Sequence, residues 1–190
     1  MLTFDADRHE YRWNGNRLPS VSEVLRRRTK LSGIAPDVLE FARMRGQAVH
    51  KAIELDIAGD LDESSLHPEV ADRLGSWRRF VQTSKFAVQG SEVRVLSQRY
   101  GYAGTFDLWG HIRREPYLID IKATALVPPT VGLQTAAYVQ AAREALSLPP
   151  MRRGVLQLGP EGRWQFLPLT RALDLREFLD ELEYLRRHDL

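Results

Sequence analysis

The chain has 190 residues, contains no cysteine, and carries a formal net charge of +2 at pH 7. This length suits one domain with a substantial core, and the composition, 43% hydrophobic and 27% charged, is that of an ordinary globular protein. The lack of cysteine excludes disulfides, thiolate zinc sites and cysteine-ligated iron–sulfur clusters. No segment has the apolar length of a signal peptide or a membrane span, so we expect a cytoplasmic protein that does not bind membranes.

The first 18 residues predict a small β-structure. Asn14-Gly15 is a strong signal for a two-residue hairpin turn between short apolar stretches. Ser20 and Glu23 then have the spacing of a capping box, which predicts that a helix begins here.

A basic segment follows this predicted helix start. It comprises Arg26, Arg27, Arg28 and Lys30. Such a run is usually a solvated surface, and contact with nucleic-acid phosphates is an equal alternative.

A longer helix is expected from Pro36 to Gly59, with proline in its first turn and glycine at its end. Its expected buried side comprises Val38, Leu39, Phe41, Ala42, Val49, Ala52 and Ile53. Gly46 in mid-helix costs roughly 1 kcal/mol relative to alanine, which suggests that something approaches this turn closely. His50 follows one turn later as a candidate metal ligand, although a lone helical histidine is more often a packing or surface residue.

A second amphipathic helix and a strand come next. Residues 68–84 predict a helix with an apolar stripe and with Arg73, Arg78 and Arg79 outside that stripe. Residues 86–96 then alternate as a strand. Glu92 in this strand faces the same side as Arg94, so an ion pair between them is the simplest expectation.

The segment from Gly101 to Lys122 has the pattern of a β-hairpin, with apolar runs at 102–109 and 117–121 and a polar connection at 110–116. Each run contains one aspartate among apolar neighbours, Asp107 and Asp120. A carboxylate buried in this way costs several kcal/mol unless it meets a partner charge or a metal.

Lys122 is two residues after Asp120, so both side chains point to the same face of the strand. Two carboxylates and a lysine on one face suit a divalent cation beside a phosphate, with the ammonium facing the nucleophile or a phosphoryl oxygen. The alternative is a structural ion pair between Asp120 and Lys122, with Asp107 capping a turn.

The remaining elements complete the expected fold. Thr130 follows two prolines and can cap a helix to about Leu146, on which Gln134 and Tyr138 share a face. A second hairpin is expected from 151 to 167 and a final amphipathic helix from 173 to 187.

Five motifs in fixed order resemble the PD-(D/E)XK nuclease superfamily, in its phage-exonuclease and RecB-like branch. These are Pro19-Ser20, Gly46-x-x-x-His50, Gly-Thr-Phe-Asp107, Asp120-Ile-Lys122 and Gln134-x-x-x-Tyr138, over roughly residues 19 to 145. The resemblance implies an α/β fold of restriction-endonuclease type, with a mixed central sheet of about four or five strands flanked by helices. We expect a single nuclease domain over 1–190, with an N-terminal hairpin at 1–19 and the core at 20–190.

The resemblance further implies metal-dependent hydrolysis of DNA phosphodiesters by an exonuclease of phage recombination or DNA repair. Expected catalytic residues are Asp107, Asp120, Lys122, Gln134 and Tyr138. Expected ligands of Mg²⁺ or Mn²⁺ are His50, Asp107, Asp120 and the Ile121 carbonyl, with Glu92 as a further candidate. Expected DNA contacts are Ser20, Arg26, Arg27, Arg28, Lys30 and Arg45.

Several alternatives stay open at this stage. DNA is the expected partner, and a single-strand annealing or recombination protein and a homo-oligomer are further candidates. The same fold could instead serve an inactive nucleic-acid-binding protein or a recombination adaptor. An intact Asp-x-Lys argues against inactivity because catalysis is what needs these charges together. Strand preference, polarity and the number of metal ions are not determined by the sequence.

Overall fold

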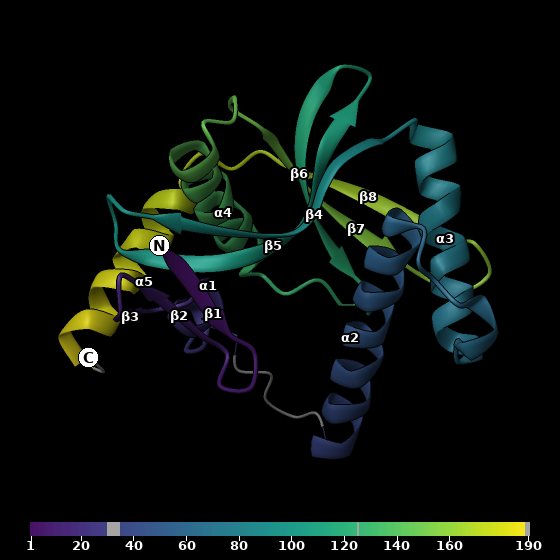
Figure 1. Cartoon of the computed structure of the whole chain (residues 1–190), viewed down its shortest axis with the longest axis horizontal. Helices are drawn as coiled ribbons and strands as arrows, with labels where there is room; N and C mark the ends of the chain where they lie inside the picture. The colour runs from purple at the N-terminus through teal and green to yellow at the C-terminus, as the bar shows by residue number, and fades with distance from the viewer. Residues whose placement is uncertain (30–34, 125, 189–190) are drawn as a thin grey trace.

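The computed structural model describes residues 1–29, 35–124 and 126–188, so Lys30 lies outside the described residues. Within these ranges the centre of the fold is a five-stranded mixed sheet in chain order. Its strands are β4 (Ala87–Ser97), β5 (Tyr102–Ile112), β6 (Glu115–Lys122), β7 (Arg152–Leu158) and β8 (Trp164–Leu169). β6 and β7 are parallel, and the other neighbouring strands are antiparallel. The expected α/β fold with a mixed sheet flanked by helices is confirmed (Figure 1).

The helices form two groups around this sheet. α1 (Val21–Leu25), α4 (Val131–Leu146) and α5 (Asp174–His188) share one apolar cluster with β4, β5 and β6. α2 (Pro36–Ala58) and α3 (Pro68–Ser84), joined through the short 3₁₀ helix η1 (Glu63–Ser65), share a second cluster with β5 to β8. The two groups lie on the two sides of Figure 1. Among the described helices, none is long and apolar enough to cross a membrane.

The N-terminal segment forms its own three-stranded antiparallel sheet of β1 (Leu2–Asp5), β2 (Glu10–Trp13) and β3 (Asn16–Leu18). The turn at Asn14-Gly15 is confirmed, since both residues have the positive φ, +49° and +85°, that the tight hairpin turn requires. β1 adds a strand to the expected hairpin. The Tyr11 hydroxyl joins this sheet to β5 through a 2.8 Å hydrogen bond with the Thr105 hydroxyl.

α2 has the predicted bounds and ends at Gly59, whose φ is +78°. Its N-terminal half, however, extends away from the sheet (Figure 1). The expectation that Val38 and Phe41 are buried is therefore wrong, because both are 55% exposed and the buried stripe begins only at Val49. No described part of the chain packs closely on Gly46, since a Cβ at this position would meet nothing within 4 Å.

Two further local predictions needed correction. The polar connection of the central hairpin is much shorter than 110–116, because β5 continues to Ile112 and only Arg113-Arg114 turns, with φ of +49° and +73°. Thr130 precedes α4 without a side-chain capping hydrogen bond. The Ser20–Glu23 capping box, in contrast, is confirmed in both directions.

Candidate metal centre

The candidate site lies where β5 and β6 separate. The strands pair from Ile112–Glu115 as far as Leu108–Ile119. Beyond that pair, the Asp107 side chain joins the two strands, because its Oδ2 accepts a 2.6 Å hydrogen bond from the backbone N–H of Ile121. The divergence leaves room beside Asp107 for side chains from other elements.

Three side chains from three elements meet at this divergence. Candidate ligand atoms of His50 on α2, Glu92 on β4 and Asp107 on β5 all lie within 4.8 Å of one another. Ser91 pairs with Leu108 and Val93 with Phe106, so Glu92 stands opposite Asp107 in the sheet. Glu92 has a φ of +49°, a backbone conformation that L-residues rarely adopt. Strained conformations of this kind are concentrated at functional sites of folded proteins.

The His50 ring is held by a backbone carbonyl. Its Nε2 lies 3.1 Å from the Ile121 oxygen, while Nδ1 lies 3.5 Å from Asp107 Oδ1 and 3.7 Å from Glu92 Oε1. A metal-binding histidine usually donates its other ring N–H to a carbonyl or carboxylate, which fixes the tautomer. This arrangement presents Nδ1 to the acidic residues. It also gives the Ile121 carbonyl an orienting role, and its direct ligation of a cation stays a prediction.

The acidic surroundings change the proton affinity of His50. Burial by itself lowers the pKa of a histidine, but the charges of Asp107, Glu92 and Asp120 outweigh burial and raise the pKa of His50 to about 9. These charges favour the protonated ring, so the site stabilises positive charge beside Asp107 and Glu92.

Asp120, which is buried, and Lys122, which is half-buried, form the part of the site on β6. Asp120 is 2% exposed, and its Oδ2 lies 2.9 Å from Lys122 Nζ, yet this oxygen has no partner of good hydrogen-bond geometry among the described residues. Burial raises the pKa of Asp120 to about 6, with Lys122 opposing and Asp107 adding to the effect. Burial tends to lower the pKa of Lys122, but Asp120 and Asp107 outweigh it and raise that pKa.

This donor set fits a hard divalent cation. Carboxylate oxygens from Asp107 and Glu92 and one imidazole nitrogen are ligands that Mg²⁺ and particularly Mn²⁺ accept. The under-partnered oxygen of Asp120 is a further acceptor in the same region. A cation could be held by His50, Glu92 and Asp107, with Asp120 adjacent and already paired to Lys122.

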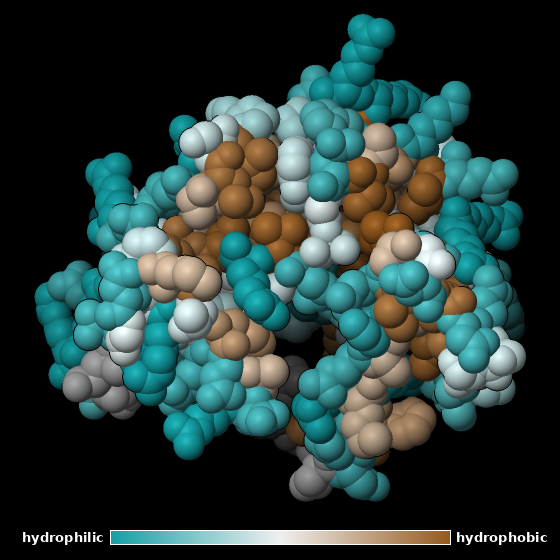
Figure 2. Space-filling view, in the orientation of Figure 1, coloured by the Kyte–Doolittle hydropathy of each residue, from teal (hydrophilic) through white to brown (hydrophobic). Residues whose placement is uncertain are grey.

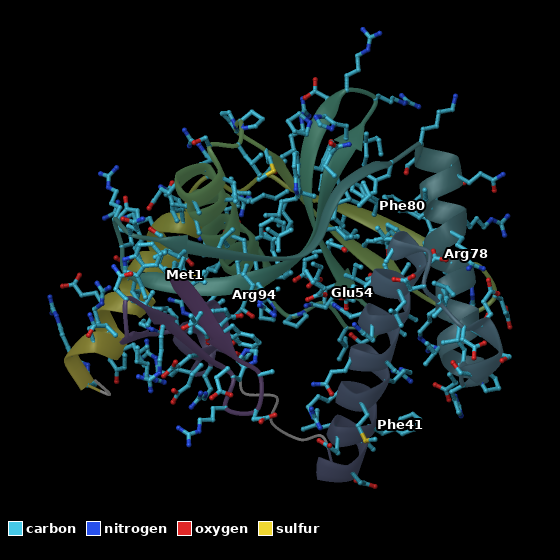
Figure 3. The ribbon with its side chains drawn as sticks, in the orientation of Figure 1. Met1, Phe41, Glu54, Arg78, Phe80 and Arg94 are labelled. Atoms are coloured by element: carbon cyan, nitrogen blue, oxygen red, sulfur yellow. The ribbon has the colours of Figure 1, made fainter. Side chains whose placement is uncertain are left out.

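A cavity of about 480 Å³ opens beside these residues, between the N-terminal sheet, α1 and α2. Figure 2 shows a hollow at this position, and Figure 3 shows Arg94 and Glu54 on its two sides. Glu92 and Thr105 also line the cavity. The sequence patterns did not assign Arg94, Lys51 or Thr105 to a site, and no motif marks them. Glu54 could have been found from its spacing, because it lies four residues after His50 on the same helix face.

The remaining predicted catalytic residues lie close to this cavity. Tyr138 lines it and is 6% exposed; burial raises the pKa of its hydroxyl, against hydrogen bonding with Gln134. Ser20 also lines it, while its hydroxyl accepts the 3.1 Å capping bond from the Glu23 backbone N–H. The two alternatives for Ser20, helix cap and substrate contact, are thus compatible in position. The catalytic roles of Gln134 and Tyr138 stay predictions.

The arginines that were expected to contact DNA do not line this cavity. Arg27 Nη2 and Arg28 Nε contact the buried carboxylate of Glu181 on α5, at 3.0 Å and 2.7 Å. These ion pairs tie α1 to α5 and compete with phosphate contact. Arg26 is exposed at the end of α1, and Arg45 lines a separate cleft at the other side of α2. DNA contact by these four residues stays a prediction.

Comparisons with known proteins give only distant likenesses. No protein-family model matches the chain, and no curated protein matches it. Among solved structures, the crystal structure of SSO0001 is similar with a TM-score of 0.39 and 17% identity, over 78% of this chain and 72% of that one. The structure of LHK-Exo in complex with dAMP is similar with a TM-score of 0.35 and 15% identity, over 90% and 92%. These values are too low to establish a function.

Proposed function

We propose that this chain is a divalent-metal-dependent deoxyribonuclease with the active-site plan of the PD-(D/E)XK superfamily. The observation that carries the proposal is the convergence of His50, Glu92 and Asp107 within 4.8 Å, beside the ion pair between buried Asp120 and half-buried Lys122. The simpler alternative, a lone structural ion pair, explains Asp120 and Lys122. It does not explain why three further ionisable side chains from three elements meet beside them.

Each residue has a role that follows from its contacts. Asp107 and Glu92 supply oxygens and His50 supplies Nδ1 to a cation, with the Ile121 carbonyl orienting the ring. A cation held there would lower the pKa of a bound water and offset charge on the scissile phosphate. Lys122, kept protonated by two carboxylates, holds a positive charge at the position where negative charge develops on a phosphoryl oxygen.

The cavity beside Glu92 is the proposed place of the nucleotide next to the scissile bond. Its lining includes the cations Arg94 and Lys51 and the hydroxyl groups of Ser20 and Thr105, together with the carboxylates of Glu92 and of Glu54, which pairs with Lys51 at 2.9 Å. Cationic and hydroxyl side chains are typical contacts of DNA phosphates. Gln134 and Tyr138 support this wall from α4 in the proposal.

The experiment is a cleavage assay on end-labelled linear DNA in Mg²⁺, in Mn²⁺ and in EDTA. We expect cleavage that requires either cation. If wild-type protein binds DNA but leaves it intact with both cations, the protein is a binding module or adaptor with this fold. Cleavage that persists in EDTA would contradict the proposal.

The proposal of an exonuclease rests on the resemblance of the histidine-bearing motifs to a branch rich in such enzymes. Linear DNA and its covalently closed circular form test this directly. We expect degradation of the linear form and survival of the circle. Loss of both forms at matching rates would assign an endonuclease instead.

A further inference from the structure

A second cleft, of about 490 Å³, lies at the carboxyl ends of β6 and β7, between α2, α3 and the β7–β8 turn. It begins where the strand of the proposed catalytic lysine ends, because Thr124 in its lining is two residues after Lys122 and Gln157 pairs with Lys122 across the sheet. The described residues that line it include Arg45, Arg73 and Arg163 and no carboxylate. We call it the arginine cleft.

Helical geometry explains why Arg45 enters this cleft and not the cavity near His50. Arg45 precedes Val49 by one turn, so it continues the buried stripe of α2 just beyond the point where the apolar core ends. At 100° per residue it lies about 140° around the helix from His50. The cleft and the metal centre are therefore on different sides of α2, with the end of β6 between them.

The two helix arginines are largely buried and poorly partnered. The side chains of Arg45 and Arg73 are 21% and 12% exposed, although the sequence pattern predicts Arg73 outside the apolar stripe. The Nε atoms of both are buried and have no hydrogen-bond partner in the described part of the chain. Both guanidinium groups share one carboxylate, Glu69, at 3.4 Å and 3.9 Å, and Arg73 also donates a 2.9 Å bond to the Glu69 backbone oxygen.

This arrangement is unfavourable unless an anion completes it. Two guanidinium groups share a single carboxylate at ion-pair distance, with the charge of Asp72 also acting on Arg73. Each unpaired Nε–H lacks the bond it would make in water. Burial lowers the pKa of Arg73, and the nearby positive charge of Arg45 lowers it further. Guanidinium forks match the geometry of phosphate oxygens, which would satisfy both donors at once.

We infer that the arginine cleft is a second phosphate-binding site, which holds a phosphodiester of the nucleic-acid strand whose scissile bond lies at the metal centre. This inference rests on the proposed function. The strand would have one segment in the cavity beside Glu92 and another in the cleft, with Lys122 between them. Arg163, exposed on the β7–β8 side, adds a third cation to the path.

The test compares Arg73→Met with Arg79→Met, an exposed arginine of the same helix outside the cleft lining. Binding of a labelled single-stranded oligonucleotide is measured in EDTA over a range of salt concentrations. We expect Arg73→Met to weaken binding about tenfold and to lower the salt slope by about one, and Arg79→Met to match wild type. In cleavage assays with metal, the increase in KM should be larger for a long oligonucleotide than for a trinucleotide.

Other outcomes are equally decisive. If wild-type protein cleaves DNA and Arg73→Met binds it like wild type, this inference fails and the proposed function stands. If wild-type protein neither binds nor cleaves DNA, thermal stabilisation by inorganic phosphate in wild type but not in Arg73→Met would identify a site for a free anion and overturn the strand assignment. If circular dichroism shows that Arg73→Met is unfolded, Arg45→Met decides the question in the same assays. Its guanidinium pairs with Glu69 at 3.4 Å and lies over the exposed Phe41 ring.

Discussion

Asp107 accepts a hydrogen bond from the backbone N–H of Ile121, with 2.6 Å between Oδ2 and N. This contact joins β5 to β6 beyond their last paired residues and lies between Asp120 and Lys122 in the chain. It leaves Oδ1 of Asp107 directed toward His50, 3.5 Å from Nδ1. One carboxylate thus holds the strand that presents Asp120 and Lys122 and also takes part in the candidate metal centre.

Metal binding should depend on pH through His50. A cation must displace the proton on this ring, and the neighbouring carboxylates raise its pKa to about 9. We expect the apparent Mn²⁺ affinity to rise by up to about tenfold per pH unit from roughly pH 7 and to level off near pH 9. Calorimetric titration at several pH values measures this, with release of a proton on binding.

His50→Ala is the control for that titration. The variant should bind Mn²⁺ more weakly and with a smaller pH dependence, because the proton-carrying ligand is gone. Electron spin-echo spectroscopy of bound Mn²⁺ should detect coupling to a ligand nitrogen in wild type only. If the pH slope and the spectrum of the variant are the same as those of wild type, His50 is not a metal ligand and has a packing role.

Lys122→Met should impair catalysis far more than metal binding. Methionine keeps most of the side-chain length and removes the charge, so the expected loss in rate is on the order of 100- to 1,000-fold. Metal affinity should stay within a few-fold of wild type, since Lys122 contributes no ligand. Lys85→Met, which removes an exposed ammonium at the end of α3, should cleave like wild type. A loss below tenfold in Lys122→Met would identify a structural ion-pair partner.

Gly104→Ala should damage both stability and the cavity. An added Cβ would lie 2.6 Å from Tyr138 Cε1 and 3.3 Å from Val21 Cγ2. Because Tyr138 is buried and cannot move freely, we expect a loss of about 1–3 kcal/mol in the free energy of unfolding and weaker DNA binding. Denaturant unfolding and oligonucleotide titration measure the two effects.

Gly75→Ala is the opposite control. Gly75 is an exposed position of α3 where an added Cβ would meet nothing within 4 Å, so alanine should stabilise the helix by up to about 1 kcal/mol. If both glycine variants change stability in the same direction, the close packing of Gly104 against Tyr138 is not what determines its effect.

The sequence predicted the fold well where signals were local. The Asn14-Gly15 turn, the Ser20–Glu23 capping box and the start of α2 at Pro36 each depend on neighbouring residues, and each is found in the structure. Buried aspartates in two adjoining strands also predicted that charged groups would need partners. That cost of burial is a local property that a sequence pattern can express.

Features that depend on tertiary arrangement were not predictable in this way. Helical periodicity identifies which side of α2 is apolar. It does not show that the N-terminal half of this helix extends beyond the sheet, which leaves Phe41 exposed. The contact between His50 and the Ile121 carbonyl joins residues 71 positions apart. The burial of Arg73 likewise depends on where the β7–β8 turn packs against α3, which no motif in α3 expresses.

The most direct test of the metal centre is the cleavage rate of Asp107→Asn as a function of Mg²⁺ and Mn²⁺ concentration. Asparagine keeps the size and an oxygen that can accept the Ile121 hydrogen bond, and removes the charge that a cation needs. Asp60→Asn, an exposed carboxylate in the loop after α2, is the matched control. We predict that Asp107→Asn loses cleavage at every metal concentration, retains DNA affinity within a few-fold, and that Asp60→Asn behaves like wild type. Normal cleavage by folded Asp107→Asn would contradict the assignment of this site.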